Sequence, residues 1–234
     1  MVVAGANLQE VKLATMSALA VIDFETTGLS PAMGDRATEV AIVLVQDGKI
    51  VDRFQSLMNA GVRISGFIEA YTGISNEMIE CAPPADEVMA AASRFVGDAP
   101  MVAHNASFDR RFWEAELERL VCPSPQPSPQ RGEGARPFAC TMLLARRLYP
   151  EARSFRLGSL AAFHDLPSSG RAHRALADAE VAAALLARIQ RDLERRYDVF
   201  DCDHELLVKV GKAPKAKVPE AIRKHFEARD CAAQ

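Results

Sequence analysis

The fold is decided by the stretch Ala18-Leu-Ala-Val-Ile-Asp23-Phe-Glu25-Thr-Thr-Gly28, in which two acids interrupt the far end of an apolar run. The run predicts a buried β-strand, and because side chains alternate along a strand, Asp23 and Glu25 point to the same face. Two neighbouring buried carboxylates are costly unless a positive charge lies between them. Gly28 then allows a tight turn. The stretch predicts a divalent-metal site at a strand end, although a solvated strand terminus gives the same pattern.

Length and composition are those of an ordinary globular protein. The 234 residues are 49% hydrophobic and 25% charged, with a net charge of -3. We expect one large domain, residues 1–200, followed by a basic C-terminal tail, residues 201–234, that is either solvated or in contact with a partner. The negative net charge argues against a general polyanion-coating protein, so any nucleic acid would bind at a local site.

The cysteines and the apolar segments indicate a cytoplasmic protein. The 5 cysteines are odd in number and include no C-x-x-C pair, so we expect reduced thiols and no zinc site. We also expect no signal peptide and no membrane contact, because no apolar stretch is long enough to span a bilayer.

Strands and helices alternate along the rest of the chain. Two β-rich runs, residues 38–46 and 49–58, flank Asp47-Gly48, a dipeptide typical of a hairpin turn. Residues 122–137 are rich in proline and predict a low-complexity surface insertion. A further strand is expected near residues 100–105, and residues 138–149 are expected to form a short strand that runs into a helix. Helices are also expected over residues 85–96 and 106–121, from residue 158 to about 163, and after Arg174 to about residue 196. The pattern predicts an α/β fold built on a mixed sheet, with the first strand at its centre.

Three more chemically active side chains fall where such a sheet would gather them. Asp109 lies in the first turn of a predicted helix, a position that the helix dipole alone also favours for an acid. His173 precedes another predicted helix and Asp178 lies within it, where an ordinary loop histidine and a solvated acid are the simpler alternatives. Ligands on open α/β sheets gather at the carboxyl ends of the strands. The ordered set of acids and histidine is what favours a functional site.

These motifs resemble the three exonuclease motifs of the DnaQ-like DEDDh family. The matching segments are Asp23-Phe-Glu25-Thr-Thr-Gly-Leu, His104-Asn-Ala-Ser-Phe-Asp109 and His173-Arg-Ala-Leu-Ala-Asp178, and Thr72-Gly-Ile-Ser75 is similar to a turn between the first two motifs. The resemblance spans residues 18–188, interrupted by the insertion. It implies a ribonuclease H-like mixed sheet of five strands, in the order 3-2-1-4-5 with strand 2 antiparallel, flanked by helices.

The resemblance also implies a role for each matching residue. Asp23, Glu25, Asp109 and Asp178 would hold two Mg²⁺ or Mn²⁺ ions. His173, on a mobile loop before its helix, would be the general base that completes the catalytic set. Two such ions can hold the water, the phosphate and the leaving oxygen of a phosphodiester hydrolysis.

Residues near the motifs would bind the substrate. The expected set is Thr26, Thr27, Gly28, Leu29, Thr72, Ile74, Asn105 and Phe108. Core packing is the alternative for Leu29 and Phe108. Many relatives have an acid ahead of the Thr-Gly-Ile turn, where this chain has Phe67 and then Glu69, so neither receives a role.

By this resemblance the chain is a metal-dependent 3′-5′ exonuclease that removes nucleoside monophosphates from a single-stranded 3′ end, with DNA preferred, in polymerase proofreading or DNA repair. A DNA polymerase subunit is the candidate protein partner, although the chain contains no convincing clamp-binding peptide. An exoribonuclease that trims RNA ends is the alternative within the family. A catalytically silent nucleic-acid-binding domain is the alternative from another class, and the complete set of five catalytic residues argues against it.

Overall fold

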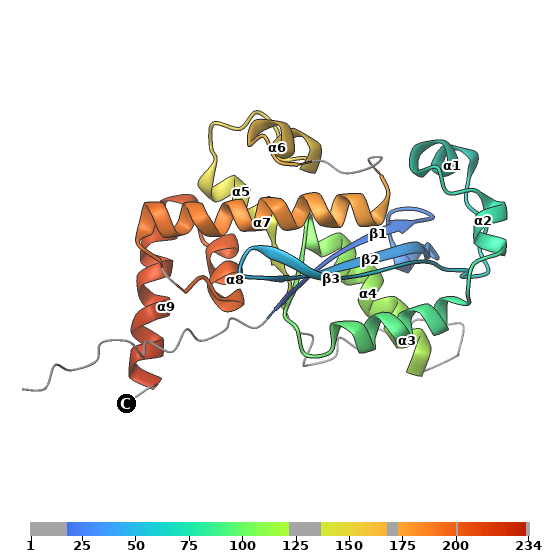
Figure 1. Ribbon diagram of the computed structural model, residues 1–234, viewed down its shortest axis with the longest axis horizontal. Coiled ribbons are helices and arrows are strands. Elements are labelled where there is room, and N and C mark those ends of the chain that lie inside the picture. Colours follow the sequence, from blue (N-terminus) through green and yellow to red (C-terminus); the bar gives the residue numbers. More distant parts are fainter. Residues whose placement is uncertain (1–17, 122–136, 168–172, 200, 233–234) are drawn as a thin grey trace, which may run out of the picture.

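The computed structural model describes residues 18–121, 137–167, 173–199 and 201–232, and shows a mixed sheet between layers of helices (Figure 1). The predicted low-complexity insertion, residues 122–137, lies outside these ranges except for Pro137. Among the described residues, no helix has both the length and the apolar composition that crossing a membrane requires.

The sheet is built around β1 (Leu19–Thr26), which lies between β2 (Ala37–Gln46) and β4 (Met101–Ala103). β1 pairs antiparallel with β2 and parallel with β4. β3 (Lys49–Leu57) pairs antiparallel with β2, and β5 (Ala139–Cys140) pairs parallel with β4. The order β3-β2-β1-β4-β5, with β2 antiparallel to the other strands, confirms the ribonuclease H-like sheet that the motifs imply.

The turn between β2 and β3 has the predicted hairpin geometry. Asp47 and Gly48 both lie in the left-handed region, with φ of 51° and 71°. A type I′ hairpin turn requires two such residues in succession, and an Asp-Gly pair adopts them with little strain. The predicted hairpin is therefore confirmed.

Helices cover both faces of the sheet. α5, α6 and α7 lie on one side of it, and α3 and α4 lie on the other (Figure 1). Their bounds are α3 (Ala85–Val96), α4 (Ala106–Val121), α5 (Thr141–Leu148), α6 (Leu157–Phe163) and α7 (Ala175–Tyr197). The bounds of α3 and α4 agree with the two helices expected from apolar spacing, and α5 lies within the strand-to-helix run expected over residues 138–149.

Alternation along β1 divides the apolar core between the two faces. Leu19 and Val21 pack in the cluster formed with α5 and α7, and Ile22 packs in the cluster formed with α3 and α4. Asp23 and Glu25 continue the row of Leu19 and Val21, because side chains two residues apart share a face. The two carboxylates therefore face the layer that contains α7.

Two short helices, α1 (Gly66–Thr72) and α2 (Asn76–Glu80), form a small outlying unit between β3 and α3. This unit lies beyond the end of the sheet to which β1 points (Figure 1). The unit has its own apolar cluster, which is separate from the two clusters on the sheet and consists of Ile64, Ile74 and Ile79. The unit thus has its own small core, and it stands near the end of β1 that carries the acids.

The C-terminal segment is folded against the main body. α8 (His204–Lys212), the short 3-10 helix η2 (Lys215–Lys217) and α9 (Val218–Ala232) follow α7. The apolar side chains of α8 and α9 are buried in the cluster that contains α7, namely Leu206, Leu207, Val210, Val218 and Ile222. The expectation of a solvated basic tail is therefore wrong for the described part of residues 201–234, because its lysines lie on helices whose other face is apolar. A first domain that ends near residue 200 stays a prediction.

Candidate active site

Three carboxylates meet at the end of β1. Ligand oxygens of Asp23, Glu25 and Asp178 all lie within 4.8 Å of one another. β1 supplies the first two, and the first turn of α7, which packs on the same face of the sheet, supplies Asp178. Glu25 is buried and the other two side chains are half-buried. Carboxylate oxygens are the ligands that hard divalent cations prefer, so this set of donors fits a divalent metal.

Asp109 approaches the same strand from the opposite layer. It lies in the first turn of α4 and is 2% exposed. Its Oδ1 accepts a hydrogen bond of 3.3 Å from the backbone N–H of Phe24, between the two acids of β1. The short strand β4 pairs with β1 only at Ala20 and Val21, so the carboxylate of Asp109 takes the place of a strand partner further along β1.

Burial and mutual repulsion raise the pKa values of these acids. Burial, followed by the charges of Asp109 and Glu25, raises the pKa of Asp23 well above its usual range. Burial, followed by the charge of Asp178, raises the pKa of Glu25 to about 8. Burial also raises the pKa of Asp109 to about 8, although backbone hydrogen bonds act in the opposite direction. Such acids retain protons near neutral pH, and a divalent cation would displace those protons and compensate the charge.

His173 lies directly before α7, next to the acids. Its backbone has a φ of 62°, and its N–H donates a hydrogen bond of 3.1 Å to Oδ2 of Asp178. Its imidazole stacks on the ring of Tyr71 in α1, with ring centroids 3.9 Å apart and ring planes 29° apart. The structure thus brings the predicted base and the predicted metal ligands together. The predicted mobility of the preceding loop falls partly on residues 168–172, outside the described ranges.

A partly buried ion pair, which the sequence analysis missed, lies beside the acids. Glu39 of β2 is opposite Glu25 in the register of β1 and β2, and its side chain is 1% exposed. Arg174 donates from Nε and Nη2 to the two oxygens of Glu39 at 3.1 and 2.8 Å. The backbone N–H of Ala175 donates to the same carboxylate at 3.1 Å. These contacts tie the start of α7 to β2, and they thereby fix the helical turn that carries Asp178.

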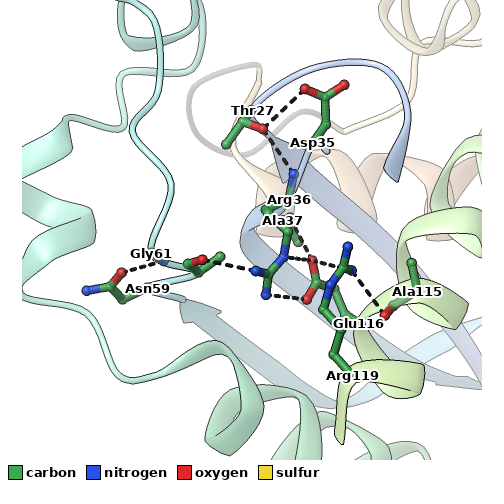
Figure 2. A network of polar contacts seen from close by, with 10 residues as sticks. Thr27, Asp35, Arg36, Ala37, Asn59, Gly61, Ala115, Glu116 and Arg119 are labelled. Atoms are coloured by element: carbon green, nitrogen blue, oxygen red, sulfur yellow. Dashed lines mark hydrogen bonds and ion pairs between the residues drawn. The ribbon is translucent and has the colours of Figure 1, made fainter. Parts of the chain in front are cut away.

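A second ion-pair network holds the loop that follows β1 (Figure 2). Glu116 of α4 has a side chain that is 1% exposed, and it accepts hydrogen bonds from Nε and Nη2 of Arg36, both at 2.9 Å. The backbone N–H of Ala37 also donates to Glu116, at 3.2 Å. Arg36 donates from Nη1 to the carbonyl of Ala60 at 3.0 Å, and its backbone N–H donates to Oγ1 of Thr27 at 3.0 Å. Arg36 therefore closes this loop and anchors it to α4.

Asp35 organises the middle of the same loop around Gly28. Its carboxylate accepts hydrogen bonds from the backbone N–H of Ser30 at 2.9 Å and from the hydroxyl of Thr27 at 3.5 Å. A Cβ atom at position 28 would lie 2.4 Å from Oδ1 of Asp35. Glycine is therefore required here if Asp35 is to keep this place. The short 3-10 helix η1 (Pro31–Met33) lies between Ser30 and Asp35.

The predicted substrate-binding residues differ in their exposure. Thr27, Gly28, Leu29, Asn105 and Phe108 have free surface, and Leu29 is 78% exposed, whereas Thr26, Thr72 and Ile74 are buried. The hydroxyl of Thr72 donates to the carbonyl of Ile68 and accepts from the N–H of Ile74. The hydroxyl of Thr72 thus stabilises the turn after α1, and the contact of Thr72 and Ile74 with a substrate stays a prediction.

His104, which opens the second motif, has a structural environment. Its Nε2 donates to the carbonyl of Phe155 at 3.0 Å, and the hydroxyl of Thr141 therefore donates to Nδ1 at 2.9 Å, because a carbonyl can only accept. Burial lowers the pKa of His104 to about 4, although the hydrogen bond to Phe155 acts in the opposite direction. The neutral ring ties the end of β4 to the start of α5 and to the segment before α6.

Comparison with known proteins gives a consistent set of relatives. A protein-family model described as "Exonuclease" matches residues 20–186, which include all the predicted catalytic residues. "DNA polymerase III PolC-type" from Halalkalibacterium halodurans is 35% identical over 180 residues, which are 77% of this chain and 12% of that protein. "3′-5′ exonuclease DinG" from Bacillus subtilis is 34% identical over 179 residues, which are 75% of this chain and 18% of that protein. This chain therefore spans only a small part of the length of these relatives.

A solved structure covers its own chain more completely. Exonuclease X, in complex with 5′ overhanging duplex DNA, is 32% identical to this chain with a TM-score of 0.56. The matched region covers 74% of this chain and 91% of that one.

Proposed function

Because this chain belongs to the exonuclease family, with the motifs of its DEDDh type, we propose that it removes nucleoside monophosphates from the 3′ end of DNA. The direction and the substrate are supported by relatives whose names state a 3′-5′ exonuclease and a complex with duplex DNA. The observation that carries the proposal is the group of three carboxylates within 4.8 Å, to which Asp109 adds a fourth from the other layer.

In this proposal, Asp23, Glu25, Asp109 and Asp178 hold two divalent cations, Mg²⁺ or Mn²⁺. When bound, such ions supply charge compensation at the phosphodiester and lower the pKa of a water that can attack it. The raised pKa values of the acids support this assignment, because carboxyl groups that resist ionisation together are stabilised as carboxylates by a cation.

His173 acts as the general base in this scheme and accepts a proton from the attacking water. An imidazole is a suitable base near neutral pH. The hydrogen bond from its backbone to Asp178 keeps the base beside the acids. We assign Thr27, Gly28 and Leu29 to the terminal nucleotide, where the exposed side chain of Leu29 offers an apolar surface that accepts any base.

We also propose that the protein acts in the cytoplasm, in polymerase proofreading or DNA repair, with a DNA polymerase subunit as its partner. PolC-type polymerases among the relatives support this partner. The match between this chain and that relative covers 12% of the relative's length.

The test is degradation of a 5′-labelled single-stranded DNA with Mg²⁺ or Mn²⁺. We expect progressive shortening from the 3′ end and mononucleotide products. Asp23→Asn should abolish cleavage, His173→Ala should lower turnover while metal binding persists, and Asp86→Asn, which changes an exposed acid of α3, should match the wild-type protein. Wild-type turnover by Asp23→Asn would rule out the assignment of the metal ligands.

Matched RNA and DNA oligonucleotides decide the substrate. Faster shortening of RNA would indicate the exoribonuclease alternative, and no shortening of either oligonucleotide with saturating metal would indicate a catalytically silent binding domain.

Metal binding itself is measured by thermal unfolding. A metal at ten times its Kd should stabilise the folded state by about 1.4 kcal/mol, which is roughly 3–6 °C for a chain of this size.

A further inference from the structure

α1 presents two aromatic rings on the side that faces His173. Phe67 and Tyr71 are 75% and 48% exposed, and their rings stack with centroids 6.0 Å apart and planes 9° apart. Residues four apart on a helix share a face, which accounts for this contact. The same helix contributes Ile68, which is partly buried, to the small apolar cluster of its own unit. Core packing of α1 therefore does not account for the two exposed rings.

The ring of Tyr71 also contacts the predicted base. The centroids of Tyr71 and His173 lie 3.9 Å apart, with ring planes 29° apart. The backbone of His173 is held by its hydrogen bond to Asp178, but two rotatable bonds still separate the backbone from the imidazole. The stack on Tyr71 restricts those bonds, and it comes from a helix with a core separate from that of the sheet.

We propose that Tyr71 is a positioning residue that holds the imidazole of His173 in place for proton transfer. This inference rests on the proposed function, in which His173 is the base. Tyr71 acts through its ring face, so the hydroxyl group is not needed. Phe67 extends the stack behind Tyr71, and α1 thereby becomes part of the frame of the site.

The kinetic test compares Tyr71→Leu with Tyr71→Phe on a 5′-labelled single-stranded DNA with Mg²⁺. Loss of the stack should lower kcat roughly 3–10-fold with little change in KM, as expected from the modest strength of an aromatic pair. Tyr71→Phe keeps a ring at this position and should retain the kcat of the wild-type protein. Phe163→Leu, which replaces a 44% exposed ring on α6, is the matched control and should have the kcat of the wild-type protein. The melting temperatures of all variants should equal that of the wild-type protein.

A double-mutant cycle separates positioning from direct contact with the substrate. If Tyr71 acts through His173, then Tyr71→Leu should cause no further loss of kcat in a His173→Ala background. A raised KM, or an additional loss of kcat in that background, would overturn the inference, because Tyr71 would then contact the substrate itself. Unchanged kcat in Tyr71→Leu would overturn it as well.

A measurement that does not depend on catalytic activity distinguishes the positioning role of Tyr71 from the proposed exonuclease function. Stacking on Tyr71 should shift the imidazole proton resonances of His173 upfield, and Tyr71→Leu should remove that shift, with His173→Ala giving the assignment. If the enzyme is active but the shift is absent, the positioning role fails alone. If the shift is present but the protein cleaves neither DNA nor RNA, the proposed function and the role of Tyr71 both fail.

Discussion

Glu116→Ala should destabilise the protein strongly, because one buried carboxylate joins α4 to the loop after β1. Glu116 accepts two hydrogen bonds of 2.9 Å from Arg36 and one of 3.2 Å from the N–H of Ala37, and Arg119 lies 3.5 Å away. Removal of the carboxylate leaves the guanidinium of Arg36, which is only 19% exposed, with the Ala60 carbonyl as its remaining partner in this network (Figure 2).

The expected loss follows from the groups left without a partner. Breaking a buried ion pair by removal of one member costs about 3–5 kcal/mol, because the other charge stays buried. The N–H of Ala37, at a residue with no exposed surface, also loses its acceptor, so we expect no less than the lower end of this range. For a chain of this size, the loss corresponds to a decrease of roughly 6–20 °C in Tm.

Urea unfolding followed by the fluorescence of Trp113 measures this loss directly. The chain has 1 tryptophan, and Trp113 is 8% exposed on the same helix. Glu114→Ala is the matched control, because the side chain of Glu114 is 44% exposed and its ion pair with Arg110 is long, at 3.6 Å. The control should change the free energy of unfolding by less than about 0.5 kcal/mol. An equally small effect of Glu116→Ala would refute the reasoning.

Two further predictions concern pH and the second ion pair. Because burial lowers the pKa of His104 to about 4, the unfolded chain binds a proton near pH 6.5 that the folded chain does not, so the contribution of His104 to stability should fall by up to about 3 kcal/mol as the pH decreases from 6.5 to 4. His104→Gln should lack this contribution, so the difference between the free energies of unfolding of the wild-type protein and the variant should change by up to about 3 kcal/mol over this pH range, and an unchanged difference would contradict the prediction. Arg174→Ala removes the charged partner of buried Glu39, which keeps only hydrogen bonds from Gln55 and from the N–H of Ala175. Because the remaining charge lies buried beside Glu25, the change should lower the free energy of unfolding by about 3 kcal/mol and raise the Mg²⁺ concentration needed for half-maximal cleavage. Thermal unfolding and a metal titration measure the two effects, and an unchanged metal requirement would argue against the role of the pair.

Local sequence signals predicted the elements whose causes are themselves local. The Asp47-Gly48 turn was predictable because few residue pairs adopt two left-handed conformations in succession. The face shared by Asp23 and Glu25 was predictable because strand alternation depends on nothing outside the strand. The helices over residues 85–96 and 106–121 followed from apolar spacing in the same way.

Contacts between distant parts of the chain could not be predicted in this way. Arg36 and Glu116 are 80 residues apart, and Arg174 and Glu39 are 135 apart, so no spacing rule connects them. The stack of Tyr71 on His173 depends likewise on how the outlying α1 unit meets the sheet.

The C-terminal helices were misread because charge was weighed above periodicity. The lysines of residues 209–224 suggested a solvated tail. The buried side chains Leu206, Leu207 and Val210 have the i, i+1, i+4 spacing of an amphipathic helix, and this spacing was available in the sequence.

The two edges of the sheet differ in a way that bears on the behaviour of the protein at high concentration. β5 has 2 residues and packs against α8, whereas β3 has 9 residues and forms the opposite edge. An edge strand of that length is a template for strand addition by another molecule, which is a common start of aggregation. Lys49, Asp52 and Arg53 place exposed charges along β3, and Arg53 is further tied to Glu180 of α7 at 2.7 Å. A strand arriving from a neighbouring molecule would have to accommodate these charges, so the long edge is protected against unwanted pairing by its own side chains.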